Sequence, residues 1–235
     1  MTYKFQTPAI FLIGPTASGK TETSLRLAEE FPLEIISVDS AMVFKEMNIG
    51  TCKPSLQNLE NVPHHLIDIL QPDAEFDVGI FIRYVDSAIQ TIIQNKKIPL
   101  FVGGTMMFHK VLFDGIHDFP RDDSLREEID QIRRNKGYQL LLNELELLDP
   151  ETFQLIDKKN PRRVQRALEI IKLTKTKLSL LKKEPSKKFL NSENCLILGM
   201  NDSKNNLDIS VEKRLRSIIE DGLVNELEKL INTYK

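Results

Sequence analysis

The sequence lacks any apolar run of the ~18–20 residues that a membrane-spanning helix needs, and its first residues lack the apolar stretch of a signal peptide. Its only two cysteines, Cys52 and Cys195, lie far apart and outside any CxxC pair. This pattern favours a reduced, cytoplasmic setting without a structural disulfide. The four histidines do not alternate with cysteines at zinc-site spacing. These absences disfavour membrane, secreted and zinc-binding classes of protein.

An excess of either charge is also lacking, because 32 Lys and Arg balance 34 Asp and Glu. The balance hides one basic stretch at 157–188, with 12 basic and 3 acidic residues, which leaves 20 basic and 31 acidic residues for the rest. A near-neutral chain with one concentrated basic stretch suits contact with a polyanion. A solvated charged surface is the alternative.

The sequence does contain an alternation of strand and helix patterns. Short apolar runs predict buried parallel strands at 9–13, 34–38, 66–70, 98–102 and 194–199. An i, i+3, i+4 stripe at 81–93 predicts a helix that packs on the sheet. The interval 113–189 holds several helical segments and no convincing strand.

The predicted fold class is therefore α/β, with a P-loop NTPase-like parallel sheet core and an inserted helical subdomain. We expect residues 1–112 and 190–235 to form the core and residues 113–189 to form the helical insert. The lysine-rich segment 182–188 has the composition of a short linker.

A phosphate loop follows the first predicted strand. Its residues fit the GxxxxGK[ST] pattern and precede a helical segment: Gly14, Pro15, Thr16, Ala17, Ser18, Gly19, Lys20 and Thr21. Glycines let backbone N–H groups converge on phosphate oxygens, and the helix N-terminus adds partial positive charge. Lys20 supplies a full charge, and the Thr21 hydroxyl can bind Mg²⁺. The motif predicts a phosphate or diphosphate ligand without specifying ATP.

Two other predicted strand ends face this loop, because ligands of open α/β sheets bind at the carboxyl ends of strands. Asp39 is placed to act as an acceptor or general base, with a turn cap at Asp39-Ser40 as the alternative. Gly103, Gly104 and Thr105 follow the fourth strand, where a Walker-B-type metal site needs a carboxylate. The lack of a carboxylate at this strand end argues against ordinary ATP hydrolysis.

An arginine-rich helix is predicted to begin at Asn160-Pro161, a capping residue followed by a first-turn proline. Its apolar residues share one face, and Arg162, Arg163 and Arg166 project from the other. Exposed guanidinium groups suit an RNA backbone or loop. Surface salt bridging with Glu169 is the alternative.

Five motifs together resemble one known family. In order they are GPTASGKT, SVDSAMVFKEMNIGTCKPS (37–55), VPHHLIDI (62–69), VGGTMMF (102–108) and NPRRVQRALEI (160–170). They closely resemble the bacterial tRNA dimethylallyltransferases, also called tRNA isopentenyltransferases, from about residue 9 onward. The phosphate loop alone is weakly specific, whereas the second and fourth motifs together are highly specific.

The resemblance implies transfer of a dimethylallyl group from dimethylallyl diphosphate to N6 of adenine 37 in tRNA, next to the anticodon. It implies that the phosphate loop holds the diphosphate, with Lys20 and Thr21 contacting diphosphate and Mg²⁺. Asp39 matches the family's general base and Thr105 the residue that steadies the leaving bridging oxygen. Arg214 matches an arginine implicated in diphosphate binding.

The resemblance also implies tRNA contacts and partners. The matching positions are Asp39, Ser40, Ala41, Met42, Thr105, Arg126, Arg162, Arg163, Val164, Gln165 and Arg166. We expect a monomer with tRNA and dimethylallyl diphosphate as partners and no membrane association. Family members usually continue beyond the point where this sequence stops, so the sequence is a fragment, a shortened enzyme with a weaker grip on tRNA, or a decayed copy.

Other functions fit the same residues. A P-loop small-molecule kinase would use Asp39 to activate a hydroxyl, and an adenine-nucleotide isopentenyltransferase would prenylate free nucleotides. A catalytically impaired, truncated copy that only binds nucleic acid is a further alternative. The pair His64-His65 is expected to be structural, and Met106-Met107 is expected to pack in the core under the glycine turn.

Overall fold

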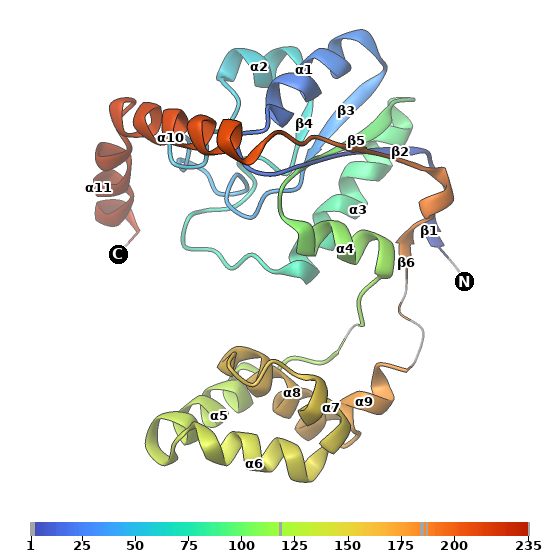
Figure 1. The fold of residues 1–235 in the computed structure, drawn as a ribbon. Coiled ribbons are helices and arrows are strands. Elements are labelled where there is room, and N and C mark those ends of the chain that lie inside the picture. The colour runs from blue at the N-terminus through green and yellow to red at the C-terminus, as the bar shows by residue number, and fades with distance from the viewer. Residues whose placement is uncertain (1–2, 118, 184–185, 187, 235) are drawn as a thin grey trace. The chain divides into compact units, whose positions relative to one another are not determined.

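The computed structural model describes residues 3–117, 119–183, 186 and 188–234. The chain divides into two compact units (Figure 1). We call Met1–Asp114 with Lys188–Lys235 the core unit, and Gly115–Lys187 the helical unit. These divisions lie two residues from the predicted boundaries at 112/113 and 189/190. The linker-like segment 182–188 lies partly outside the described residues.

The core unit is built on a parallel sheet in the order β4-β3-β5-β2-β7. Its strands are β2 (Ala9–Ile13), β3 (Leu33–Ser37), β4 (His64–His65), β5 (Ile98–Gly103) and β7 (Cys195–Gly199). A smaller parallel pair joins β1 (Tyr3–Phe5) and β6 (Lys188–Leu190). The predicted parallel sheet core is confirmed, and four of the strands lie within one residue of the predicted ranges.

Two strand predictions are wrong. Residues 66–70 form no strand, because Leu66 and Asp68 have φ of 63° and 53°, which extended backbone does not allow. The strand lies just before them, as β4, which pairs with β3. Conversely, β6 lies partly within the interval expected to be free of strands, since three residues are too few for a clear alternation.

Helices cover both faces of the sheet. The core unit contains α1 (Lys20–Glu30), α2 (Leu56–Asn61), α3 (Val78–Gln94), α4 (Met106–Asp114), α10 (Lys204–Glu220) and α11 (Leu223–Thr233). Side chains of successive strand residues point to opposite faces. Phe11 and Phe101 stack with centroids 4.6 Å apart in the core on the α3–α4 side. Leu12 and Leu100 pack with residues of α1 on the other side.

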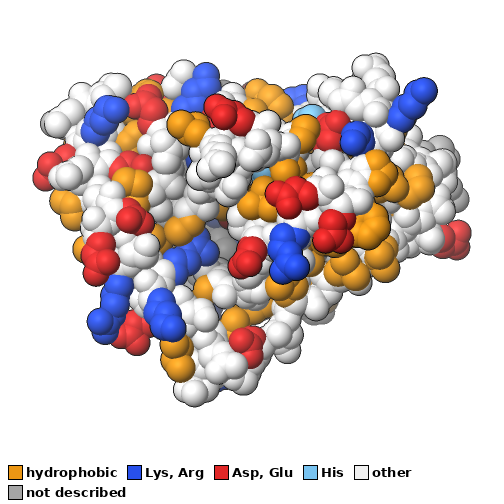
Figure 2. Space-filling model, turned by 90° about the horizontal axis from the view of Figure 1, so that it is seen from above, with side chains coloured by type: hydrophobic (Ala, Val, Ile, Leu, Met, Phe, Trp, Pro, Cys, Tyr) orange, Lys and Arg blue, Asp and Glu red, His pale blue; other side chains and the backbone are white. Residues whose placement is uncertain are grey.

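The predicted amphipathic helix is present as α3. It begins after Asp77, whose side chain accepts a hydrogen bond from the Ile80 N–H at 2.8 Å. Its stripe of Phe81, Val85 and Ile89 is fully buried. Hydrophobic side chains also reach the surface on the face shown in Figure 2, where basic and acidic side chains are interspersed.

The helical unit has a hydrophobic core of its own. Its helices are α5 (Asp123–Lys136), α6 (Tyr138–Leu148), α7 (Pro150–Leu155), α8 (Pro161–Thr174) and α9 (Leu178–Leu181). Ile129, Leu141 and Leu168 are fully buried within it. The predicted start of α8 is confirmed, since the Asn160 side chain accepts from the Arg163 N–H. Within the described part of the chain, no helix is long and apolar enough to cross a membrane.

Candidate functional site: a phosphate-binding cleft

A cleft of about 790 Å³ lies at the carboxyl ends of β2, β3 and β5. Most of the site residues predicted for the core unit line it: Gly14 to Thr21, Asp39, Met42, Thr105 and Arg214. Ser40 and Ala41 are not among its lining residues. The fold therefore brings together groups that lie up to two hundred residues apart in the sequence.

The phosphate loop wraps between β2 and α1. Gly14 cannot carry a side chain, because a Cβ there would lie 2.6 Å from the Met200 carbonyl oxygen. Gly19 precedes α1 with φ of 83° and offers no side-chain acceptor to the first N–H groups of the helix. Those N–H groups, together with the helix dipole, form a binding site for an anion.

Lys20 reaches back over the loop that precedes it. Its Nζ donates to the carbonyl oxygens of Gly14 at 2.9 Å and Pro15 at 2.6 Å. Burial lowers the pKa of Lys20, the positive charge of Arg214 lowers it further, and the charge of Asp39 opposes this. An incoming anion would therefore relieve the repulsion between these two cations.

Asp39 uses one carboxylate oxygen to shape the turn after β3. Its Oδ1 accepts from the N–H groups of Ala41 at 2.8 Å and Met42 at 3.2 Å. Its Oδ2 accepts no hydrogen bond from the part of the chain that the structure describes, and Asp39 lines the cleft. Asp39 therefore does cap the turn, as the alternative interpretation predicted. The cap fixes the carboxylate through Oδ1 and leaves Oδ2 available to accept a proton.

The glycine turn after β5 is tightly packed. A Cβ on Gly103 would lie 2.1 Å from the Val38 carbonyl oxygen, so only glycine fits. Thr105 follows and lines the cleft. Behind the turn, buried His109 lies with Nε2 3.1 Å from the Gly103 carbonyl oxygen, and burial lowers the pKa of this imidazole. Sequence reasoning missed this support, since its only signal is a histidine among the apolar residues of α4.

The expectation that Met106 and Met107 pack in the core is wrong. The two residues are 59% and 57% exposed. Phe108 is buried instead and stacks on Phe81 with centroids 4.2 Å apart. At the first turn of a helix, adjacent residues point in different directions, so only some of them can face the sheet.

Arg214 comes from α10 and docks at the edge of the cleft. Its Nε donates to Cys52 Sγ at 3.0 Å, and its Nη2 donates to the Thr51 carbonyl oxygen at 3.5 Å. The guanidinium retains further N–H donors for an anion in the cleft.

No cluster of three or more His, Cys, Asp or Glu suited to a metal exists among the described residues. His64 Nδ1 lies 2.7 Å from the Val62 carbonyl oxygen, and His65 Nε2 lies 2.8 Å from Glu34 Oε2. Both histidines therefore have structural partners. Thr21, the last residue of the phosphate loop, is exposed at the start of α1 and offers a hydroxyl oxygen as a ligand for a metal ion.

In the helical unit, the expectation that Arg166 projects outward holds only in part, because its partly exposed side chain pairs with Glu169. Glu169 is fully buried in α8, and its carboxylate lies 2.9 Å from Arg166 Nη1 and 3.1 Å from Arg126 Nη2. Arg166 also donates to the Pro120 carbonyl oxygen at 2.9 Å. The salt-bridge alternative holds for Arg166, because a buried carboxylate requires nearby cations.

Arg162 and Arg163 are exposed on α8, where the nearest ion pair of Arg163 is a 3.9 Å contact with Asp157. Val164 is fully buried, so its side chain is not accessible to RNA. Gln165 Nε2 donates to the Arg126 carbonyl oxygen at 2.8 Å. The exposed arginines of the predicted RNA-contacting helix therefore lie in its first turn, and Arg166 is partly exposed.

The fold and the cleft define a phosphate-loop α/β protein in which Gly103, Gly104 and Thr105 replace a strand-end carboxylate. A family model described as IPP transferase matches residues 42–235. The chain is 41% identical over 224 residues to the tRNA dimethylallyltransferase of Nitrosococcus oceani, covering 95% of this chain and 71% of the relative. It is 39% identical to tRNA dimethylallyltransferase 2 of Geotalea uraniireducens, covering 94% and 72%.

Solved structures agree with these relatives. The full-length tRNA isopentenylpyrophosphate transferase of Bacillus halodurans is 33% identical with a TM-score of 0.64, covering 97% of this chain and 71% of that protein. A eukaryotic dimethylallyltransferase acting on tRNA is 28% identical with a TM-score of 0.82, covering 98% and 57%. The chain belongs to the IPP transferase family.

Proposed function

We propose that this chain is a tRNA dimethylallyltransferase that prenylates N6 of adenine 37 in tRNA, giving N6-isopentenyladenosine. The observation that carries the proposal is the convergence of the phosphate loop, Asp39, Thr105 and Arg214 on one cleft. Two relatives that are about 40% identical bear this name, which supports the assignment.

The first task of the site is to stabilise the leaving diphosphate. In the reaction the bond between the dimethylallyl carbon and the bridging oxygen breaks, and the diphosphate departs with the electron pair. Lys20, Arg214 and the first N–H groups of α1 neutralise the charge that develops. The Thr105 hydroxyl donates to the bridging oxygen as it leaves.

The second task is to activate a weak nucleophile, since the lone pair of an adenine amine is delocalised into the ring. As the bond from N6 to carbon forms, N6 must lose a proton. Oδ2 of Asp39 accepts it, while Oδ1 stays anchored by Ala41 and Met42. General-base help of this kind contributes roughly 10²–10⁴-fold.

Mg²⁺ fits the oxygen donors of this cleft. Mg²⁺ in such sites is held by few protein oxygens and by substrate phosphates, and Thr21, the last residue of the phosphate loop, offers a hydroxyl oxygen in this cleft. The ion supplies further neutralisation of the diphosphate when bound.

The RNA side of the proposal rests on the helical unit. Arg162 and Arg163 are exposed there within the basic stretch 157–188, and they suit contacts to RNA phosphates. The adenine must leave the anticodon-loop stack, as base-modifying enzymes require. We further propose that the chain acts as a monomer in the cytoplasm.

The test is a parallel incubation with labelled dimethylallyl diphosphate and Mg²⁺. One reaction contains unmodified tRNA, a second contains AMP, and a third contains ATP with hydroxyl acceptors in place of the labelled diphosphate. Label should appear in tRNA at adenine 37 only, and Lys20→Ala should strongly reduce the amount of label. Label in AMP would favour a nucleotide prenyltransferase, and phosphorylation of a hydroxyl acceptor would favour a kinase.

A further inference from the structure

A carboxylate of α11 binds a backbone turn that lies almost 180 residues earlier in the sequence. Glu226 Oε2 accepts from the N–H groups of Asn48 and Ile49, both at 2.8 Å, and Oε1 accepts from the Gly50 N–H at 3.0 Å. Three consecutive N–H groups that converge on one anion form a compact nest. The proposed reaction does not use Glu226.

The electrostatics of this contact favour the ionised carboxylate. Burial by itself would raise the pKa of Glu226, but the three N–H groups and the charge of Lys53 bring it below its ordinary value. Lys53 is itself buried and donates to Asp68 Oδ1 at 2.6 Å. Glu226 is therefore negatively charged at neutral pH and holds the turn strongly.

The same turn also holds Arg214. Directly after the nest, the Thr51 carbonyl oxygen and Cys52 Sγ accept the two hydrogen bonds from Arg214. Arg214 and Cys52 line the cleft together with the phosphate loop. Hydrogen bonds within the turn support its shape: the Cys52 N–H donates to the Ile49 carbonyl oxygen at 3.0 Å, and Thr51 Oγ1 donates to the Met47 carbonyl oxygen.

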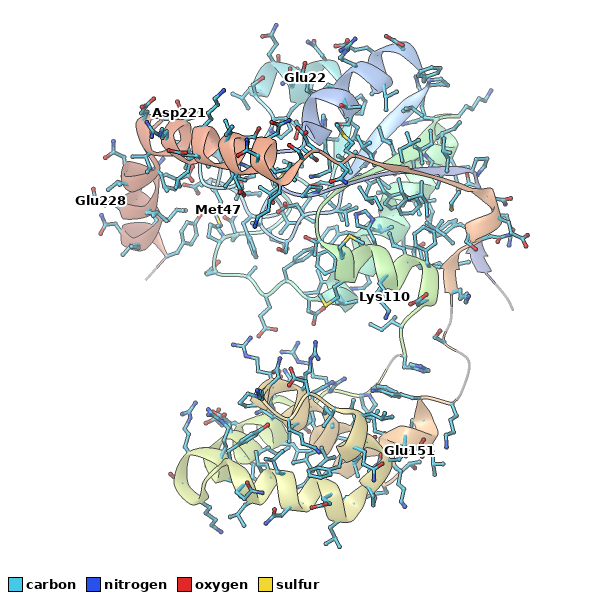
Figure 3. The ribbon with its side chains drawn as sticks, viewed as in Figure 1. Glu22, Met47, Lys110, Glu151, Asp221 and Glu228 are labelled. Carbon is cyan, nitrogen blue, oxygen red and sulfur yellow. The ribbon has the colours of Figure 1, made fainter. Side chains whose placement is uncertain are left out.

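Packing as well as charge joins this turn to α11. A Cβ on Gly50 would lie 3.0 Å from Leu223 Cδ1, so the backbone approaches the helix closely. Met47 directly precedes the turn, and Figure 3 shows it on one side of α11, with Glu228 on the opposite side. A shift of the turn relative to α11 would move the acceptors that orient the guanidinium.

We infer that Glu226 is a positioning residue for the diphosphate half of the site, acting through the 48–52 turn on Arg214. The inference rests on the proposed function only in naming diphosphate as the anion. The competing view is that Glu226 merely attaches α11 to the core unit. In that case its loss would affect stability and not the action of Arg214.

The experiment is a double-mutant cycle read out by calorimetric binding of inorganic pyrophosphate and of dimethylallyl diphosphate, with Mg²⁺. Glu226→Gln should weaken both by about tenfold, since it removes a charge-assisted contact that fixes an anchoring group. Glu228→Gln, on the exposed side of the same helix, is the matched control and should bind like wild type. In the Arg214→Ala background, Glu226→Gln should add less than about twofold, because coupled residues are not additive.

Steady-state kinetics supply a second readout. Glu226→Gln should raise KM for dimethylallyl diphosphate more than it lowers kcat at saturation, whereas simple destabilisation would lower both activity and the midpoint of thermal unfolding. The inference would be overturned if Glu226→Gln bound both ligands with wild-type affinity. It would also be overturned if Glu226→Gln lowered the affinity equally in the wild-type and Arg214→Ala backgrounds. If Glu226→Gln does not fold, Glu226→Asp keeps the charge at shorter reach and enters the same cycle.

The two proposals fail in different ways. If wild type binds neither pyrophosphate nor dimethylallyl diphosphate, the proposed function fails. If wild type binds both and Arg214→Ala weakens them while Glu226→Gln does not, only the positioning role fails.

Discussion

At the scale of single residues, the two carboxylate oxygens of Asp39 have different surroundings. One oxygen accepts backbone N–H groups and sets the turn, and the other has no partner among the described residues. A carboxylate that was free on both oxygens would rotate, and alignment with the amine would carry an entropic cost. The structural and chemical interpretations of Asp39 are therefore compatible.

Asp39→Asn separates these two functions. An asparagine Oδ1 can still accept from Ala41 and Met42, but the amide cannot take a proton. We expect turnover to fall by at least ~10²-fold with diphosphate affinity nearly unchanged. Single-turnover kinetics and calorimetry would measure the two quantities, with Asp77→Asn at the start of α3 as a control. Turnover near that of wild type would remove Asp39 from the mechanism.

Lys20→Ala should have the opposite signature. Removal of the ammonium takes a full positive charge out of the phosphate loop, so diphosphate binding should weaken by at least about tenfold. Lys110→Ala, which removes a charge exposed on α4, should not change it. The measurement is the affinity of wild type, Lys20→Ala and Lys110→Ala for pyrophosphate. An unchanged affinity in Lys20→Ala would count against the phosphate-loop assignment.

At the scale of secondary-structure elements, one buried carboxylate joins three helices of the helical unit. Asp149 follows α6 and caps α7 by accepting from the Thr152 N–H and, at 2.7 Å, from Thr152 Oγ1. It also accepts from the Ser179 N–H of α9 at 2.8 Å. Burial would raise the pKa of Asp149, but these hydrogen bonds outweigh it and lower the pKa to about 2.

Asp149→Ala should lower the free energy of unfolding of the helical unit by about 2–4 kcal/mol at neutral pH. Because the folded pKa is depressed, this contribution is present above about pH 4 and is lost as pH falls toward 2. Thermal unfolding at pH 7 and pH 3 should therefore show a smaller difference between mutant and wild type at the lower pH. Glu151→Ala, on the exposed side of α7, is the control. A difference independent of pH would contradict the assignment.

At the scale of the whole molecule, the groups that we propose to bind diphosphate lie in one compact unit, and the exposed Arg162 and Arg163 lie in the other. The cleft lies within the core unit, and the basic stretch lies almost entirely in the helical unit. Changes to the arginines should therefore act on RNA binding without altering diphosphate binding.

Arg162→Ala with Arg163→Ala should weaken tRNA binding and reduce the slope of log affinity against log salt by about 1–2, since each phosphate contact releases a counterion. Pyrophosphate affinity should be unchanged. Salt titrations of tRNA binding compare the variant with wild type, and identical slopes would show that this helix turn does not contact RNA.

Arg166→Ala should have a different effect, because it removes a partner of buried Glu169 and should lower the temperature of unfolding.

Contiguous patterns in the sequence determined the phosphate loop and the strands β2, β3, β5 and β7. A buried parallel strand is a short apolar run, and a phosphate loop is eight successive residues, so each signal is complete within one segment. The motifs around Asp39 and Thr105 likewise pointed to the IPP transferase family, which the comparisons confirmed.

Only the tertiary structure decided which charged groups meet. Arg166 pairs with buried Glu169 although its own side chain stays partly exposed, because the fold of the helical unit buries that carboxylate and brings Arg126 to it. Glu226 binds a turn almost 180 residues away, and no local pattern encodes such a pairing. Local propensity and periodicity act over a few residues, whereas the partner of a buried charge depends on packing between distant segments.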